Sequence, residues 1–384
     1  MIYFDNAATT QTLPSVVDAM LPFLRSNYFN PSAQYSAAQD AKRTLEQFRS
    51  YIAKTLGAKP SEVRFTSGGT ESDNWALKGI ALANQGKGKH VVVSAIEHHA
   101  VLNSAVWLER NGFSISYVQP NQWGIIEPES LRNAMRPDTV LASVMVANNE
   151  VGSIQPIKEL ASVAHSAGAL FHTDAVQAYG HIPLNVRDLG VDALSVSAHK
   201  LHGPKGVGML YARKGMPIES FVHGGAQERG YRAGTENLAG IAGMVQACRL
   251  LFGEDGSSPA ALQKNAAHCA ELKRKMVNQL NSLIHDCRMN GSENSLPGIL
   301  SVSFKGVSSE ALLLLLDRDG LCASAGSACA SGSLEPSHVL QSMGVAPEWA
   351  RGTIRFSFSE LNTEQEVSQA AQIIANAVAQ VRGA

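Results

Sequence analysis

The sequence has almost no net charge and no hydrophobic run long enough to cross a membrane. Its 384 residues include 32 Lys plus Arg against 33 Asp plus Glu, a formal charge of −1. This balance argues against nucleic acid or an anionic membrane as a partner held by a basic field. The densest apolar run, Leu312–Leu316, ends at Asp317, well short of the ~18 apolar residues of a membrane span. No basic leader precedes Asp5, so we expect no secretory signal and a cytoplasmic location.

The composition also disfavours disorder and a disulfide framework. Apolar residues make up 45% of the chain and charged residues 17%, which excludes disorder as a description of the whole chain. The cysteines are odd in number and form no C-x-x-C pair, which fits a reducing compartment better than disulfides or a zinc site. They are Cys248, Cys269, Cys287, Cys322 and Cys329. We find no internal repeat and no low-complexity tract.

Helical and extended patterns alternate between about residues 36 and 250. Residues 36–56 have apolar side chains at helical spacing, with Gly57 at the position of a C-terminal cap. Helical patterns also cover 71–83, 101–110 and 157–167. Short β-branched runs predict strands at 63–66, 91–94, 115–118, 140–146, 169–172 and 193–196. Buried strands that alternate with helices predict an α/β fold with a mostly parallel sheet covered on both faces.

A linker at 253–259 precedes a different pattern. It consists of a helix over about 260–282, a strand at 299–304, a helix at 309–317, a strand at 353–357 and a last helix at 363–381. We therefore predict a large domain over 13–255 and a smaller α+β domain made of 1–12 plus 256–384.

Polar and titratable side chains follow the carboxyl ends of five predicted strands. In an open α/β sheet these ends meet at one cleft, where ligands bind. The residues are Ser67 to Thr70, Glu97 to His99, Asn148 to Glu150, Asp174 with Gln177, and Ser197 to Lys200.

Each element also has an ordinary structural interpretation. Glycines and Thr70 before a helix suit a phosphate group, but they also suit a tight turn with an N-cap. The glycines at 203–208 favour a hairpin-like turn over a dinucleotide loop. Asp174 could be a capping residue, and His98 an ordinary half-buried histidine. Lys200 after an apolar strand is the sharpest signal, because burial favours the neutral amine that a Schiff-base nucleophile requires, although such a lysine could also simply reach solvent.

A lysine, an aspartate, a phosphate loop and an imidazole in one cleft together indicate a pyridoxal phosphate site. Lys200 would bond the cofactor aldehyde, and Asp174 would keep the pyridine nitrogen protonated so that the ring can accept electrons. An NAD or ATP site would explain the glycines but would leave these two residues without a role.

The motifs resemble those of the cysteine desulfurases of the nitrogen-fixation and iron–sulfur-cluster type, which are class V, fold-type I pyridoxal phosphate enzymes. The resemblance runs from residue 1 to the C-terminal helix. It rests on residues 3–10 (YFDNAATT), 66–72 (TSGGTES), 148–152 (NNEVG), 197–206 (SAHKLHGPKG), 223–230 (HGGAQERG), 232–235 (RAGT) and 324–340. It implies a homodimer whose subunits have a large, mostly parallel seven-stranded sheet domain and a smaller α+β domain.

The resemblance also implies roles for individual residues. Lys200, His98 and Cys329 would be catalytic, and Asn149 and Arg355 would hold the substrate, Arg355 by a bidentate contact with its carboxylate. The cofactor would be bound by Lys200, Gly69, Thr70, His98 (stacked on the ring), Asn149, Asp174, Gln177 (at the ring hydroxyl), Ser197, His199 and, from the neighbouring subunit, Thr235.

The implied reaction removes sulfur from L-cysteine, leaves L-alanine and forms a persulfide on Cys329. The freed Lys200 would take the Cα proton, and His98 would handle the thiol proton with an ordinary imidazole pKa of ~6.5. Small residues around Cys329 suit a segment that must swing. The persulfide would pass to an iron–sulfur scaffold or another thiol acceptor, where Cys329 could also be a transient cluster ligand. No other metal site is expected.

The sequence leaves two alternative functions open and departs from the family pattern at four positions. A related class V enzyme (a selenocysteine lyase or a small amino acid aminotransferase) and a non-catalytic sulfur-relay scaffold are the alternative functions. Cys248, Cys269 and Cys287 are interpreted as packing residues, and Cys322 as a core residue or a second redox residue. The family pattern usually differs at four positions that affect substrate entry and partner preference, namely Phe29, Tyr35, Ala226 and Tyr231.

Overall fold

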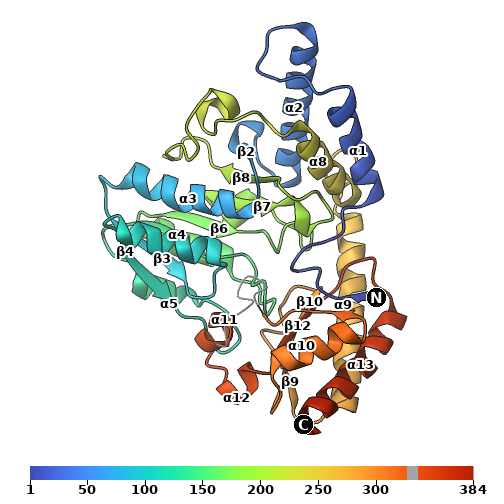
Figure 1. Cartoon of the computed structure of the whole chain (residues 1–384). Helices are drawn as coiled ribbons and strands as arrows, with labels where there is room; N and C mark the ends of the chain where they lie inside the picture. The colour runs from blue at the N-terminus through green and yellow to red at the C-terminus, as the bar shows by residue number, and fades with distance from the viewer. Residues whose placement is uncertain (327–335, 384) are drawn as a thin grey trace.

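A computed structural model describes residues 1–326 and 336–383 (Figure 1). Its largest sheet has seven strands in the order β2-β8-β7-β6-β5-β3-β4. These are β2 (Val63–Thr66), β3 (His90–Ser94), β4 (Ser114–Val118), β5 (Thr139–Ser143), β6 (Leu170–Asp174), β7 (Ala193–Ser197) and β8 (Gly208–Ala212). β8 is antiparallel to both neighbours, and the other four pairings are parallel. The prediction of a mostly parallel seven-stranded sheet is confirmed.

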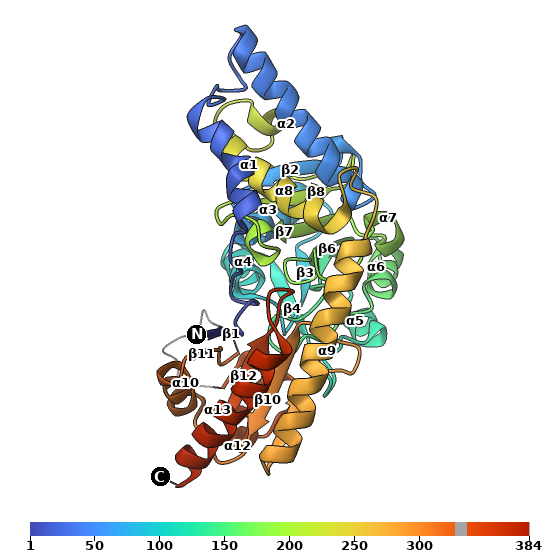
Figure 2. The same cartoon turned by 90° about the vertical axis from the view of Figure 1, so that its right-hand side faces the viewer.

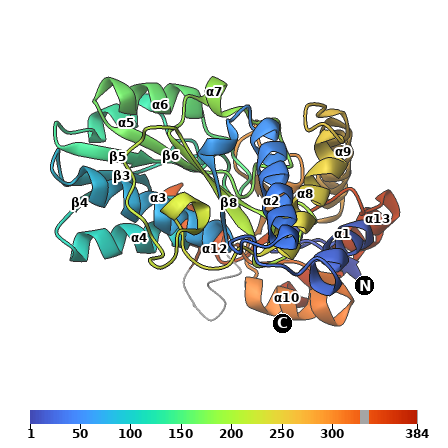
Figure 3. The same ribbon diagram turned by 90° about the horizontal axis from the view of Figure 1, so that it is seen from above.

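Helices cover both faces of this sheet, as Figure 3 shows from above. Helices α3 (Gly69–Asn84) and α4 (His99–Arg110) lie on one face. The cluster on the other face includes residues of α2 (Ser36–Thr55), α5 (Pro128–Ala134), α6 (Ile157–Ser166), α7 (Val186–Leu189) and α8 (Leu238–Phe252). Successive strand residues alternate between the two cores: Val91 and Val93 pack with α3 and α4, while Val92 packs with the opposite cluster.

The sequence pattern did not predict β8, because a glycine-rich segment leads into this strand. The glycine-containing segment at 203–208 connects β7 to β8, an antiparallel pair, as the prediction of a hairpin-like turn implied. Helix α1 (Pro14–Arg25), which packs on α8, was also missed. Three short 3-10 helices complete this part: η1 (Pro60–Glu62), η2 (Ala198–Lys200) and η3 (Gln227–Gly230).

The C-terminal part has its own antiparallel sheet, of order β12-β10-β9. Its strands are β9 (Cys287–Asn290), β10 (Ile299–Phe304) and β12 (Thr353–Ser357). Helices α9 (Ala260–Leu283) and α13 (Glu364–Gly383) pack together beside this sheet (Figure 2). The remaining helices are α10 (Ser309–Arg318), α11 (His338–Ser342) and α12 (Pro347–Ala350). A separate hydrophobic cluster joins this sheet to α9, α10 and α13, whereas α11 and α12 pack in a cluster of the large sheet.

The N-terminal residues join this second part. Strand β1 (Ile2–Tyr3) pairs in parallel with β11 (Leu321–Cys322), and the Ser357 N–H donates to the Phe4 carbonyl at 2.7 Å. The hydrophobic clusters do not follow the predicted division of the chain throughout, since Leu262 and Ile299 pack in a cluster of the large sheet. The boundary at residue 255 therefore stays a prediction. Within the described ranges, no helix has the length and apolar character needed to cross a membrane.

Candidate active site

One cavity of about 250 Å³ lies at the carboxyl ends of β2, β3, β5, β6 and β7. The structure brings ten predicted site residues together in its wall: Gly69, Thr70, His98, Asn149, Asp174, Gln177, Ser197, His199, Lys200 and Arg355. Thr235 does not line the cavity; it lies exposed between η3 and α8. Cys329 lies outside the described residues. The cavity is therefore assembled from loops that are far apart in the sequence.

Lys200 projects from η2, directly after β7, toward the N-terminal segment of the chain. Its Nζ donates hydrogen bonds to the carbonyls of Ala7 at 2.5 Å and Ala8 at 2.9 Å. The same segment is tied to η2 by Thr10, whose N–H and hydroxyl both donate to the His199 carbonyl. Carbonyl acceptors therefore orient the amine inside the cavity.

The start of α3 forms an anion-binding wall. Gly68 has φ +149°, and no side chain of the described residues caps this helix. The first N–H groups of the helix are therefore available to an anion, which the helix dipole also favours. A Cβ at Gly69 would lie 2.6 Å from Cγ2 of Val176, so glycine is required for this close approach. Thr70 follows Gly69 in the helix and also lines the cavity.

His199 stands beside this wall as a neutral imidazole. Burial, together with the charges of Lys200 and Lys205, lowers the pKa of His199 to about 4. Its Nδ1 lies 3.1 Å from the Thr9 hydroxyl. A neutral ring can donate one hydrogen bond to an anion without adding a charge.

Asp174 ends β6 as a buried carboxyl group. Burial raises its pKa to about 6, although the Val176 N–H, which donates to Oδ1 at 2.8 Å, and the nearby Lys200 act in the opposite direction. Gln177, three residues further along in the turn after β6, donates from Nε2 to the Ala7 carbonyl at 2.8 Å. Asp174 and Gln177 thus face the same cavity with an acid and an amide.

His98 forms the N-cap of α4, which fixes its ring. Nδ1 accepts the Ala100 N–H at 3.1 Å, so the neutral ring carries its proton on Nε2. Burial, and then the charge of Lys200, lowers the pKa of His98 to about 4. The ordinary imidazole pKa expected from the sequence is therefore wrong for this site, because the sequence does not reveal burial beside a lysine.

Arg355, on β12, brings a buried positive charge from the second part of the chain. Its side chain is 2% exposed; one terminal nitrogen donates to Asp5 Oδ1 and the other to the Asn149 carbonyl, both at 2.9 Å. Nε has no hydrogen-bond partner among the described residues. Arg355 can bind a carboxylate by exchanging one of these partners.

Sequence reasoning missed Asp73 and Met145, which also line the cavity. Asp73 lies four residues after Gly69, about one helical turn, and that spacing places both on one helix face. This spacing is visible in the sequence, but an ordinary Asp on the solvated face of a helix would look the same.

The other cysteines lie away from the cavity. Cys248 and Cys269 are buried in α8 and α9, as predicted for packing residues. Cys287 is half-buried at the start of β9, shortly after α9, and packs against the second cluster. Cys322 pairs with Tyr3 in the short parallel sheet. None of the four lines the cavity.

The fold and the cavity define a class of proteins, which comparison with known proteins identifies. Residues 2–370 match the model of the family described as aminotransferase class-V, and the chain belongs to that family. The chain is 46% identical over 382 residues to the cysteine desulfurase IscS of Methanosarcina thermophila, covering 99% of this chain and 93% of that protein. Within the family, the chain belongs to the cysteine desulfurases.

Solved structures agree with this family assignment. A NifS-like protein superposes with a TM-score of 0.90 at 38% identity, covering 99% of both chains. A structure described as SspA in complex with cysteine gives a TM-score of 0.81 at 34% identity, covering 93% of this chain and 99% of that one.

Proposed function

We propose that this protein is a pyridoxal phosphate-dependent cysteine desulfurase, which converts L-cysteine to L-alanine and leaves a persulfide on Cys329. The observation that carries the proposal is the convergence of Lys200, Asp174 and the uncapped start of α3 on one cavity. The relatives and the SspA structure that contains cysteine support the same substrate.

The residues of the cavity fit pyridoxal phosphate. The glycine-lined, uncapped start of α3, with Thr70, Ser197 and His199, would hold the phosphate. Asp174 would face the ring nitrogen. Gln177 would reach the ring hydroxyl with its second amide hydrogen, since the first is used by Ala7.

The cofactor, when bound, supplies an aldehyde for the substrate amine and a ring that withdraws electrons from Cα. Lys200 moves the Cα proton at Nζ, and the carbonyls of Ala7 and Ala8 hold that amine in place beforehand. Arg355 binds the substrate carboxylate. His98 donates from Nε2 to the substrate, because Nδ1 is engaged by Ala100.

Sulfur transfer itself is proposed for Cys329. Its thiolate would attack the substrate sulfur, the carbon–sulfur bond would break with its electron pair left on carbon, and a proton would complete alanine. The persulfide would then pass to an iron–sulfur scaffold or another acceptor thiol. We further propose a cytoplasmic homodimer in which Thr235 reaches the neighbouring cofactor phosphate, consistent with the exposure of Thr235 in the single chain.

Two variants test the proposal. Borohydride reduction followed by peptide mapping should place the cofactor adduct on Lys200, and K200A should lose both the adduct and turnover. C329A should keep the yellow cofactor but form no persulfide. C248A is a matched control for cysteine loss away from the cavity and should still form the persulfide.

Two results would contradict the proposal. An adduct on another lysine would remove the assigned cofactor site. Sulfide release by C329A at the parent rate would remove the assigned nucleophile.

A further inference from the structure

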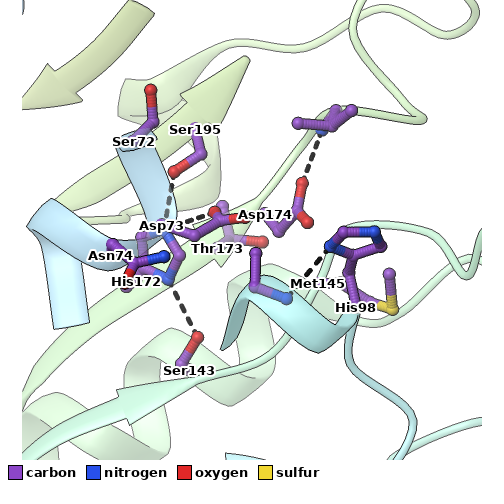
Figure 4. Close-up of polar contacts among 12 residues, drawn as sticks. Ser72, Asp73, Asn74, His98, Ser143, Met145, His172, Thr173, Asp174 and Ser195 are labelled. Atoms are coloured by element: carbon purple, nitrogen blue, oxygen red, sulfur yellow. Dashed lines mark hydrogen bonds and ion pairs between the residues drawn. The ribbon is translucent and has the colours of Figure 1, made fainter. Parts of the chain in front are cut away.

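A second carboxyl group, Asp73, lies beside Asp174 at the base of the cavity. Figure 4 shows Asp73, on α3, next to Asp174 and His172 of β6 and Ser195 of β7. Asp73 is 1% exposed and lines the cavity. The polar side chains of Asp174 and Ser195 lie beside it (Figure 4). Two carboxyl groups in contact inside a protein cannot both ionise at low cost.

The surrounding groups supply little positive charge to compensate a second carboxylate. Burial lowers the pKa of His172 to about 3, so its ring is neutral. That ring bonds Ser143 at 2.8 Å and Ser195 at 3.0 Å, and its Nε2 is 3.7 Å from Asp73 Oδ1, too far for a hydrogen bond. Burial raises the pKa of Glu97 to about 8, which leaves this nearby acid neutral as well.

The remaining charge is that of Lys200, and it acts on Asp174. Asp174 also accepts the Val176 N–H. On Asp73, Oδ1 finds no hydrogen-bond donor among the described residues. An ionised Asp73 would therefore hold a buried negative charge with one bare oxygen, whereas a protonated Asp73 can donate to its neighbour.

We propose that Asp73 is a positioning residue that stays protonated and donates a hydrogen bond to the Asp174 carboxylate, so that a single negative charge faces the cofactor ring nitrogen. Burial and the neighbouring Asp174 both raise the pKa of Asp73 well above its ordinary value, in agreement with this assignment. The hydrogen bond makes Asp174 less basic. The ring nitrogen then keeps its proton instead of losing it to Asp174, and the ring stays an electron acceptor.

This inference rests on the proposed function, and its test uses the cofactor-loaded protein. Infrared difference spectra between the parent protein and D73N should show loss of a protonated carboxyl band that shifts on exchange into D₂O. D188N, which removes an exposed carboxyl group on α7, should lose no such band. A protein loaded with ¹⁵N-labelled cofactor reports the protonation of the ring nitrogen by NMR.

D73A should shift the ¹⁵N signal toward the unprotonated ring, since loss of a hydrogen bond to a charged group raises the pKa of Asp174 by roughly one to two units. D73N, which keeps a neutral donor, should restore the signal toward that of the parent. If D73A does not fold, the infrared comparison of D73N still decides.

Two results would overturn the inference: no protonated carboxyl band lost in D73N, or a parent-like ¹⁵N signal in D73A. Both leave the adduct on Lys200 untouched. A missing adduct would instead overturn the proposed function, so the two failures are distinguishable.

Discussion

A buried ion pair connects the loop at 223–235 to the large sheet, and its removal should destabilise the protein strongly. Both side chains, Arg49 of α2 and Glu228 of η3, are 3% exposed and form two hydrogen bonds, at 2.6 and 2.8 Å. Glu228 also accepts the Phe65 N–H of β2 at 3.1 Å, and Arg49 donates to the Val63 carbonyl at 3.0 Å. Glu228 has φ +47°, a strained backbone that these contacts hold.

E228Q keeps the shape of the side chain but removes the buried carboxylate, so that the buried Arg49 keeps only the half-exposed Glu46, at 3.0 Å from Nε. Removing one partner of a buried pair typically costs about 3–5 kcal/mol. Because domains are stable by only about 5–15 kcal/mol, this is a large part of the total. D40N offers a matched control on the same helix, since the Asp40–Arg43 pair is mostly exposed and pairs of that kind contribute at most about 1 kcal/mol.

Urea unfolding followed by circular dichroism should therefore show a much lower midpoint for E228Q than for D40N. Limited proteolysis should cut E228Q between residues 223 and 235 sooner than the parent protein, because the loop loses its attachment. An R49M/E228M double variant should recover part of the lost stability, since no unpaired charge remains. Equal midpoints for E228Q and D40N would refute this reasoning.

Three further predictions concern the cavity and its surroundings. Because burial raises the pKa of Glu97 to about 8, the stability that its protonated form contributes is complete below its unfolded pKa and is lost as pH rises through 8. The free energy of unfolding of E97Q, measured by urea titration, should therefore rise relative to that of the parent protein by about 1.4 kcal/mol per pH unit between the unfolded pKa of Glu97 and pH 8. A difference that does not depend on pH would contradict this. G69A should weaken cofactor binding measured by absorbance titration, because its Cβ meets Val176 at 2.6 Å, and V176A should relieve the effect; failure of V176A to do so would place the cause elsewhere. R355K keeps the charge but loses the guanidinium fork, so kcat/KM for cysteine should fall roughly 10- to 100-fold, and an unchanged kcat/KM would exclude carboxylate binding by this residue.

The sequence predicted most of the fold because strand and helix periodicities are local. The strands at 63–66, 299–304 and 353–357 match β2, β10 and β12 at both ends. By contrast, β1 and β11 have two residues each and pair across more than three hundred positions. Such a pairing depends on tertiary contacts, so no local pattern could reveal it.

The cavity was predicted in its outline but not in its electrostatics. Residues after strand ends were expected to converge, because parallel strands share one edge. The hydrogen bond between Arg355 and Asp5 joins residues 350 positions apart, and the low pKa of His98 arises from burial beside Lys200. Both depend on distances in space, which neither spacing nor composition contains.

The placement of β8 has a consequence for the order in which the protein is built. Among the described residues, strand β2 pairs within the sheet only with β8, although 141 residues separate their nearest ends, Thr66 and Gly208. Gly208 allows this contact, since a Cβ there would lie 2.7 Å from Cα of Gly68. The ribosome must therefore release more than half of the chain before the start of α3 can settle opposite Lys200. Under the proposed function, the cofactor would therefore bind only after this edge of the sheet has formed, late in the folding of the newly made chain.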